Sequence, residues 1–307
     1  MTSFKLFATL VLTAIAASTL TAETYCPASA TSLPLRMINR HQMIVSVSIN
    51  HAGPFSFLLD TGTQMTMLDT TLAATLKLAT SGTAEVASAG VSVSASFAEV
   101  GLVEVGGRSV ADQNVLVYDL RNPRATGVDI QGVLGEDFLE HFDMLIDNGH
   151  RTLCLDAAGK MQAAVKGQHV ALLETGKDGS EGGVAPLAHS LIVSAKLTDG
   201  MRPVRLKLDS GTNMPFLYNT SDYMALGLFH GAALRGGGAN GVQRTFTALP
   251  AQEVRIGAVG IGKVTFITLV GAQKNSRTSD FDGLMTMGMF KRIMIDHADH
   301  FAVLEAW

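Results

Sequence analysis

The chain has 307 residues, a net charge of −4, 47% hydrophobic residues and 16% charged residues. This length suffices for one large domain or for two of ordinary size. The high apolar and low charged content excludes an intrinsically disordered chain. Without an excess of basic residues, the chain also lacks the charge that holds a phosphate backbone. We therefore expect a folded protein that does not bind nucleic acid.

The N-terminus has the pattern of a secretory signal peptide. Lys5 precedes an apolar, uncharged run from Leu6 to Leu20, and Ala22 fits the last residue before cleavage. The run is shorter than the about 20 apolar residues that span a membrane, although an uncleaved anchor is the alternative. We expect residues 1–22 to be removed, and the mature protein to be periplasmic or secreted with no membrane span.

Cys26 and Cys154 are the two cysteines of the chain. In an oxidising compartment they can pair, which would tie the mature N-terminus to the end of the first half. The alternative is two unlinked thiols, with Cys154 buried as a small apolar side chain. Neither cysteine has a nearby histidine in a recognisable nucleophile signature. We favour the disulfide.

The two halves of the chain follow one pattern, which begins with a predicted strand in each half. Both strands alternate, are rich in β-branched residues and precede a turn signal. An apolar run then ends in Asp-Thr/Ser-Gly-Thr, at Asp60 and at Asp209, which lie 149 positions apart. Because the other landmarks keep nearly this offset, the pattern indicates an internal repeat. The paired landmarks are residues 43–49 and 191–197, 104–106 and 255–257, and 144–147 and 293–296.

Short alternating runs with frequent glycine predict an all-β fold for both halves. The best helix candidates are residues 70–78 and their counterpart, residues 221–228. A glycine-rich stretch without apolar period indicates a flexible connector between the halves. We predict a first lobe over residues 36–160, a linker over 161–185 and a second lobe over 186–307.

An apolar strand that runs into Asp-Thr/Ser-Gly-Thr resembles the active-site turn of the aspartic peptidases. The short lobes are similar to retropepsin-like members of that family, here with two lobes fused in one chain. The resemblance covers nearly all of the mature sequence. It implies a bilobal acid-protease fold, with two similar β-barrel lobes and the active site between them. It also implies a polypeptide substrate, with no metal and no cofactor.

Asp60 and Asp209 are the catalytic pair that the resemblance implies. Two carboxyl groups held close together in a partly buried site cannot both ionise. The ionised member can take a proton from a water molecule that attacks the peptide carbonyl, while the protonated member polarises that carbonyl. Because one chain holds both aspartates, we expect a monomer.

The resemblance assigns supporting roles to the residues after each aspartate. A glycine lets the turn bend and lets the two backbones approach. The residue directly after the aspartate reaches across to the opposite loop, and a later hydroxyl supports the outer carboxylate oxygen. These are, in the same order, Gly62 and Gly211, Thr61 and Ser210, and Thr63 and Thr212.

A second family element, an apolar pair followed by glycine, passes behind each active turn. The first half matches it, with Val133 and Leu134 followed by Gly135. In the second half, Thr286 occupies the glycine position, unless Gly288 replaces it through a local shift. A threonine adds bulk where the backbones approach, which leaves open whether the second lobe keeps the family geometry and the full catalytic strength of the pair.

Two hairpins are candidate flaps, the lids that close over substrate in this family. They span residues 86–97 and 234–246. An ordinary surface hairpin is the alternative for the second one. We expect its flexible tip to bind substrate through Arg235, Gly236, Gly237 and Gly238.

The paired motifs favour an aspartic endopeptidase that cleaves extended polypeptide. The first alternative is a catalytically weak or inactive peptide-binding protein of the cell envelope with the same fold. The second alternative is a structural or adhesive β-protein of the envelope in which the motifs have no function.

Overall fold

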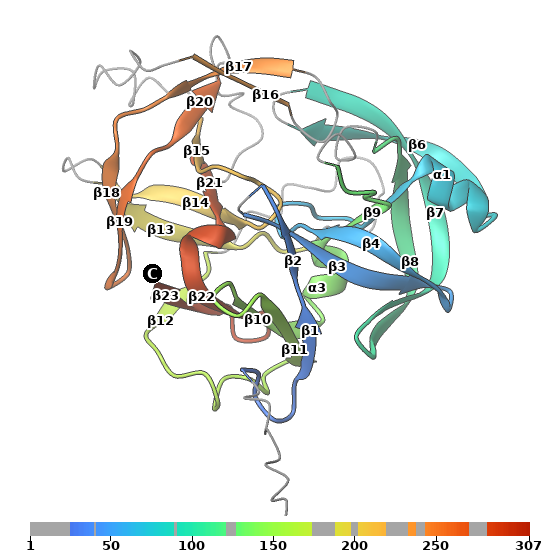
Figure 1. The fold of residues 1–307 in the computed structure, drawn as a ribbon, viewed down its shortest axis with the longest axis horizontal. Coiled ribbons are helices and arrows are strands. Elements are labelled where there is room, and N and C mark those ends of the chain that lie inside the picture. The colour runs from blue at the N-terminus through green and yellow to red at the C-terminus, as the bar shows by residue number, and fades with distance from the viewer. Residues whose placement is uncertain are drawn as a thin grey trace, which may run out of the picture.

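Nearly every element of the structure is a β-strand, and the strands form three sheets (Figure 1). The computed structural model describes residues 25–39, 41–88, 91–120, 127–173, 188–197, 202–218, 233–237, 243–269 and 281–307. One sheet forms each lobe, and the third sheet joins the two lobes. The bilobal all-β fold that the sequence predicts is confirmed.

The first lobe is an eight-stranded sheet that closes on itself. Along β3, Val45, Val47 and Ile49 point into the core while Ser46 is exposed, which is the period of a half-buried strand. β3 pairs with β4 along most of its length and with β7 at its end, so the sheet becomes a barrel. In sheet order the strands are β2 (Arg36–Ile38), β3 (Gln42–Ile49), β4 (Ala52–Leu59), β9 (Gly132–Leu134), β5 (Met67–Asp69), β8 (Arg108–Tyr118), β7 (Val91–Val105) and β6 (Thr80–Ser88).

The second lobe is a nine-stranded sheet with the same parallel pair at its centre. β14 runs parallel to β21, with Leu206 opposite Gly283, as β4 runs parallel to β9, with Phe57 opposite Gly132. Most residues of these four strands are buried, including Leu58 and Leu59 of β4 and Leu206 and Leu208 of β14. In sheet order the strands are β16 (Ala233–Gly237), β17 (Gln243–Ala248), β20 (Ile267–Leu269), β15 (Phe216–Leu217), β21 (Gly283–Thr286), β14 (Val204–Asp209), β13 (Ile192–Lys196), β18 (Gln252–Ile256) and β19 (Val259–Val264).

A six-stranded sheet, at the bottom of Figure 1, takes strands from both halves of the chain. Its central strands are antiparallel, with Leu145 opposite Met294 and the flanking residues paired symmetrically around them. All six residues of the strand Phe142–Asp147 are buried. In sheet order the strands are β1 (Thr31–Pro34), β11 (Thr152–Ala157), β10 (Phe142–Asp147), β22 (Phe290–Asp296), β23 (Phe301–Ala306) and β12 (His169–Ala171).

The helices of the described part are single turns: α1 (Thr70–Thr75), α3 (Glu136–Leu139) and η1 (Met287–Met289). Asp69 caps α1 by accepting a hydrogen bond from the Thr71 N–H, 2.8 Å away. α1 ends before the predicted residue 78 because Lys77 adopts a left-handed φ of 55°. The predicted counterpart, residues 221–228, lies outside the described residues. No described helix is long and apolar enough to cross a membrane.

The predicted lobe boundaries at residues 36–160 and 186–307 stay predictions, since the third sheet belongs to both halves. The predicted linker, residues 161–185, is described up to Leu173. Within it, β12 pairs with β23, with Val170 opposite Ala302. The start of this connection is therefore part of the shared sheet.

Cys26 and Cys154 form a disulfide at the edge of the shared sheet. Both are buried in a cluster that also contains Leu145 and Met294 from the two central strands. The bond therefore fixes the segment before β1 to the sheet that joins the lobes.

We predict that reducing this disulfide lowers the free energy of unfolding by about 2–4 kcal/mol, because the bond closes a long loop in the unfolded chain. Urea unfolding with and without a thiol reductant measures the difference. A Cys26→Ala/Cys154→Ala variant is the control, since its unfolding should not respond to the reductant. Equal unfolding midpoints for the native chain in both conditions would contradict the prediction.

Candidate active site

The two aspartates lie at the ends of equivalent strands, β4 and β14, which reach the middle of the molecule from opposite lobes (Figure 1). Each strand is held by its parallel neighbour up to the turn. The Asp60 N–H donates to the Leu134 carbonyl at 3.0 Å, and Asp209 lies opposite Thr286 in the register of β14 and β21. The sheets therefore bring both Asp-Thr/Ser-Gly-Thr turns to the interface between the lobes.

Four crossed hydrogen bonds join the two turns. The Thr61 hydroxyl donates to the Leu208 carbonyl at 2.9 Å, and the Ser210 hydroxyl donates to the Leu59 carbonyl at 2.8 Å. Each hydroxyl also accepts the backbone N–H of the other residue, at 3.0 Å for Thr61 N–H and 3.1 Å for Ser210 N–H. Both side chains are fully buried. The turns are thus locked to each other in one relative position.

Each glycine of the motif faces the aspartate of the opposite lobe. A Cβ atom added to Gly62 would lie 2.5 Å from Cγ of Asp209, and one added to Gly211 would lie 2.3 Å from Cγ of Asp60. No other residue fits without moving a carboxyl group. The glycines are therefore required by the close approach of the two carboxyl groups, not by an unusual backbone φ.

The two carboxyl groups are held differently. Asp60 accepts from the Gly62 N–H at 2.8 Å and from the Thr63 hydroxyl at 2.9 Å. Asp209 accepts from the backbone N–H groups of Gly211, at 2.8 Å, and Thr212, at 3.0 Å. The Thr212 hydroxyl instead donates to the Met214 carbonyl at 3.1 Å. Thr63 thus takes the position expected of it, whereas Thr212 supports its aspartate through the backbone.

Burial raises the pKa values of both carboxyl groups. It raises the pKa of Asp60, although hydrogen bonds from Thr63 and Gly62 partly offset this. Burial and then the nearby charge of Asp60 raise the pKa of Asp209 to about 7. Below neutral pH the pair therefore shares a proton and titrates as a unit.

Gly135 meets the first active turn from behind. A Cβ atom there would lie 2.7 Å from the backbone carbon of Met65. The next residue, Glu136, begins α3 and donates its N–H to the Thr63 carbonyl at 2.9 Å. The first turn is therefore supported by backbone groups that pass very close to it.

Thr286 supports the second turn by other means. It is fully buried, and its hydroxyl donates to the Thr212 carbonyl at 2.8 Å. Its side chain thus serves the carbonyl that matches the one bound by Glu136 in the first lobe. Gly288 does not replace the missing glycine, because it packs against His41, whose Nδ1 would lie 2.4 Å from an added Cβ. The added bulk of Thr286 therefore does not disrupt the second turn, because its hydroxyl forms a hydrogen bond that holds the turn.

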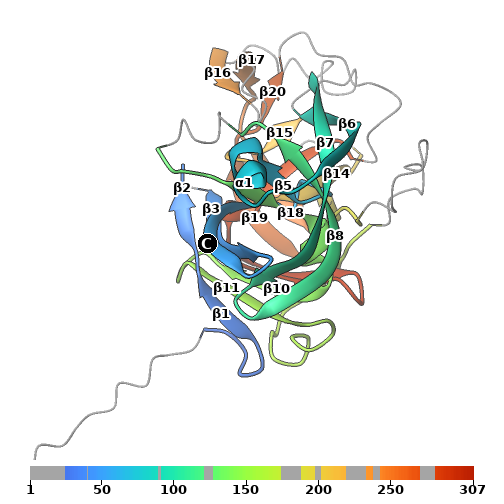
Figure 2. The same cartoon turned by 90° about the vertical axis from the view of Figure 1, so that its right-hand side faces the viewer.

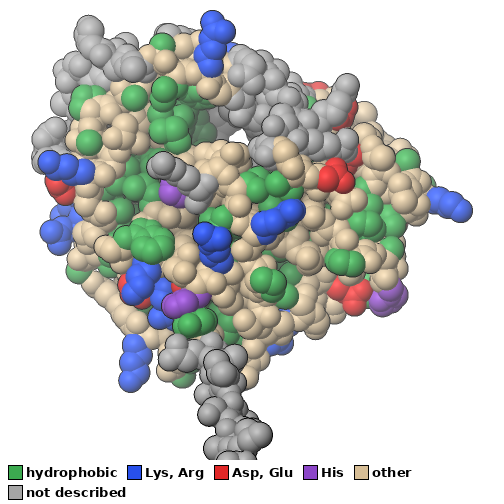
Figure 3. All heavy atoms as spheres, in the orientation of Figure 1, with side chains coloured by type: hydrophobic (Ala, Val, Ile, Leu, Met, Phe, Trp, Pro, Cys, Tyr) green, Lys and Arg blue, Asp and Glu red, His purple; other side chains and the backbone are tan. Residues whose placement is uncertain are grey.

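The candidate flaps lie on the side of the molecule opposite the shared sheet (Figures 1 and 2). Residues 86–97 fall in the β6–β7 hairpin, in which Val86 is opposite Val93. In the second lobe, Arg235, Gly236 and Gly237 belong to β16, which pairs with β17, while Gly238 lies outside the described residues. At this end Figure 3 shows a hollow with hydrophobic side chains on its second-lobe side. Substrate contact by these hairpins stays a prediction.

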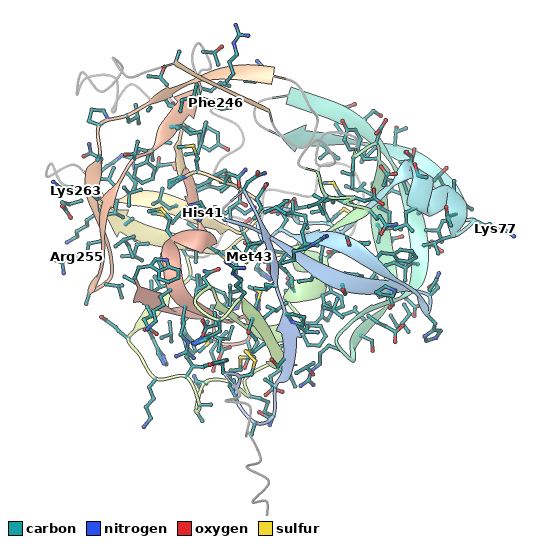
Figure 4. All side chains as sticks on the ribbon, viewed as in Figure 1. His41, Met43, Lys77, Phe246, Arg255 and Lys263 are labelled. Carbon is teal, nitrogen blue, oxygen red and sulfur yellow. A yellow bond between two sulfur atoms is a disulfide. The ribbon has the colours of Figure 1, made fainter. Side chains whose placement is uncertain are left out.

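Sequence reasoning missed two side chains that bind the glycine carbonyls of the turns. Gln42 donates through Nε2 to the Gly211 carbonyl at 2.6 Å, and Lys207 donates through Nζ to the Gly62 carbonyl at 2.7 Å. Gln42 lies between His41 and Met43, which Figure 4 shows near the middle of the molecule. A charged residue in the apolar run before Asp209 was the one signal in the sequence that pointed to Lys207.

Among the residues described, no group of three or more His, Cys, Asp or Glu side chains is arranged to hold a metal ion. His297, for example, binds the Phe142 carbonyl through Nδ1 and the Glu136 carboxyl group through Nε2.

Comparisons with known proteins agree with this geometry. Residues 45–138, which include Asp60 and Gly135, match the family model described as aspartyl protease. The chain is similar in structure to the aspartic proteinase from Irpex lacteus, with a TM-score of 0.55 and 14% sequence identity. That similarity covers 90% of this chain and 97% of the other. No curated protein sequence matches the chain.

Two β-lobes that each present an Asp-Thr/Ser-Gly-Thr turn to a shared interface define the bilobal acid-protease fold. Residues 45–138 of the first lobe are similar to the aspartyl protease family, and the structural similarity shows the same fold over 90% of the chain.

We predict that Ser210→Ala lowers the free energy of unfolding by about 2 kcal/mol or more, because it leaves the buried Leu59 carbonyl and Thr61 N–H without their partner. Urea unfolding measures the change. Ser46→Ala, on the exposed side of β3, is the matched control and should stay within about 0.5 kcal/mol of the native chain. Equal losses in the two variants would show that the crossed hydrogen bonds contribute little.

Proposed function

We propose that this chain is an aspartic endopeptidase that hydrolyses peptide bonds with a water molecule activated between Asp60 and Asp209. The observation that carries the proposal is the pair of buried turns, each with its glycine against the opposite carboxyl group. That arrangement brings the two carboxyl groups close enough for the charge of Asp60 to raise the pKa of Asp209. A pair of carboxyl groups, one ionised and one protonated, can carry out water-mediated peptide hydrolysis without a covalent intermediate.

The proposed reaction depends on the protonation state of the Asp60–Asp209 pair. One carboxylate takes a proton from the water molecule as its oxygen attacks the peptide carbonyl carbon. The other carboxyl group donates a hydrogen bond to the carbonyl oxygen, which stabilises the charge that develops there. When the carbon–nitrogen bond breaks, a proton passes to the leaving amine, and the pair returns to its singly protonated form. The hydrogen bonds from Gly62, Thr63, Gly211 and Thr212 keep both carboxyl groups oriented through these steps.

The alternative of a catalytically weak peptide-binding protein rested on Thr286. Its hydroxyl binds the Thr212 carbonyl, and Asp209 keeps both of its backbone hydrogen bonds. This geometry supports the enzyme over the binding protein.

We also propose that the enzyme is exported and acts as a monomer. The leader-like residues 1–22 and the Cys26–Cys154 disulfide are what a periplasmic or secreted protein would have. A monomer is sufficient because both aspartates lie in one chain.

Peptide cleavage should decline as the pH rises through about 7, because the pair then loses the proton that polarises the carbonyl. Because burial raises the pKa of the pair, the loss of activity should occur at a pH well above the usual pKa of an aspartate. The measurement is cleavage of a diverse peptide library by the mature protein between pH 3 and pH 9. Undiminished cleavage at pH 9 would contradict the proposed mechanism.

Asp60→Asn and Asp209→Asn should each reduce the rate of cleavage by about 10²–10⁴-fold or more, because an amide can neither take nor give the proton. Asp112→Asn is a matched control. Its side chain is exposed, and its φ of 52° is one that asparagine accepts readily. If Asp60→Asn cleaves as fast as this control, the proposed function is wrong.

A further inference from the structure

Lys207 is a buried lysine beside the catalytic pair. It lies in β14, two residues before Asp209, and only 6% of it is exposed. A buried ammonium group is costly unless it has partners. Nζ donates to the Gly62 carbonyl at 2.7 Å and lies 5.7 Å from the centre of the Phe281 ring. The lysine of the second lobe therefore ends on the active turn of the first lobe.

The fold itself does not require a lysine at this position. Lys207 is opposite Leu284 in the parallel pair of β14 and β21, as Leu58 is opposite Val133 in the pair of β4 and β9. Leu58 is 5% exposed and packs in an apolar cluster with Val133. A leucine thus fills the equivalent site in the first lobe. One side of the catalytic pair has a fixed cation, and the other side has an alkyl group.

The strands next to Lys207 bring no charge of their own to it, since it faces Ile192 on β13 and Leu284 on β21 in the sheet register. Among the described residues, its ammonium acts on the carboxyl groups of Asp60, Asp209 and Glu136. Glu136 has its own cation, His297, whose Nε2 lies 3.1 Å from its carboxyl oxygen. The carboxyl group of Glu140 acts on both members of that pair, and Tyr218 is close enough to Asp209 to sense its charge.

We propose that Lys207 is a positioning residue of the active site, which holds the Gly62 turn and supplies the positive charge that keeps the Asp60–Asp209 pair singly ionised at acidic pH. The inference rests on the proposed function, because a singly ionised pair matters only if the pair activates water. Its physical basis is that a cation beside an anion stabilises the ionised form. Burial acts in the opposite direction and favours full protonation of both carboxyl groups.

Loss of the Lys207 charge should raise the pH at which the carboxyl pair titrates. The positive charge of Lys207 lowers the pKa values of both Asp60 and Asp209. Removing it raises both, so the pair becomes doubly protonated at a higher pH than before. The acidic limb of the pH–rate profile should therefore move upward by about 1 pH unit or more, and the neutral limb should move in the same direction.

The test compares two neutral variants, Lys207→Leu and Lys207→Gln. Leucine is the residue that the first lobe has at this position, so the core should accept it. Glutamine keeps a donor for the Gly62 carbonyl but removes the charge, and it gives a second variant if the first does not fold. Lys196→Gln, on an exposed position of β13, is the control. Two readouts apply to each protein: the pH–rate profile with a cleaved peptide, and the carboxyl ¹³C NMR titration of labelled aspartate.

An upward shift of both readouts in the Lys207 variants, with none in Lys196→Gln, supports the inference. Titrations of the pair that stay at the native pH in a folded Lys207→Gln variant overturn it, even if the rate falls. If the native protein cleaves no peptide, the proposed function fails. In that case the NMR titration still decides whether Lys207 controls the charge of the pair.

Discussion

The crossed hydrogen bonds between Thr61 and Ser210 are the contacts on which the active site depends. They connect two turns that come from different sheets, and they do so in a fully buried place where a lost hydrogen bond has no water to replace it. They fix the distance between the two turns, and the other contacts of the site depend on that distance. The glycines have room for no side chain, the charge of Asp60 raises the pKa of Asp209, and Gln42 and Lys207 reach across to the opposite turn.

The shared sheet gives these short contacts a rigid base. The central strands pair symmetrically around Leu145 and Met294, residues that lie at equivalent places of the two halves. Both strands end in an aspartate whose carboxyl group caps the next turn, Asp147 through the His150 N–H and Asp296 through the Asp299 N–H. The lobes therefore share one sheet and one continuous core instead of meeting across a separable interface.

Motif and spacing were enough to predict the fold class, and the structure places Asp60 and Asp209 together as that reasoning expected. The roles of Thr286 and Lys207 depend on distances between residues far apart in the sequence, which the sequence alone does not give. Thr286 seemed an obstruction because it stands where the first half has Gly135. A Cβ atom at Gly135 would indeed lie 2.7 Å from the backbone carbon of Met65, yet at Thr286 there is room for a hydroxyl that binds the Thr212 carbonyl. Likewise, the target of Lys207 is in the other lobe, 145 positions away, and no local pattern indicates it.

The two aspartates are held by different hydrogen-bond donors, and this difference affects the direction in which a peptide can bind. A site with perfect two-fold symmetry offers a peptide the same energy whether it lies in one direction or the reverse. Here Asp60 accepts from one backbone N–H and a threonine hydroxyl, while Asp209 accepts from two backbone N–H groups. In the described part of the chain, Lys207 places a cation on one side of the pair, where the equivalent position on the other side is Leu58. The two orientations of a peptide bound between the lobes are therefore unequal in energy, so the site can distinguish the amino end of that peptide from its carboxyl end.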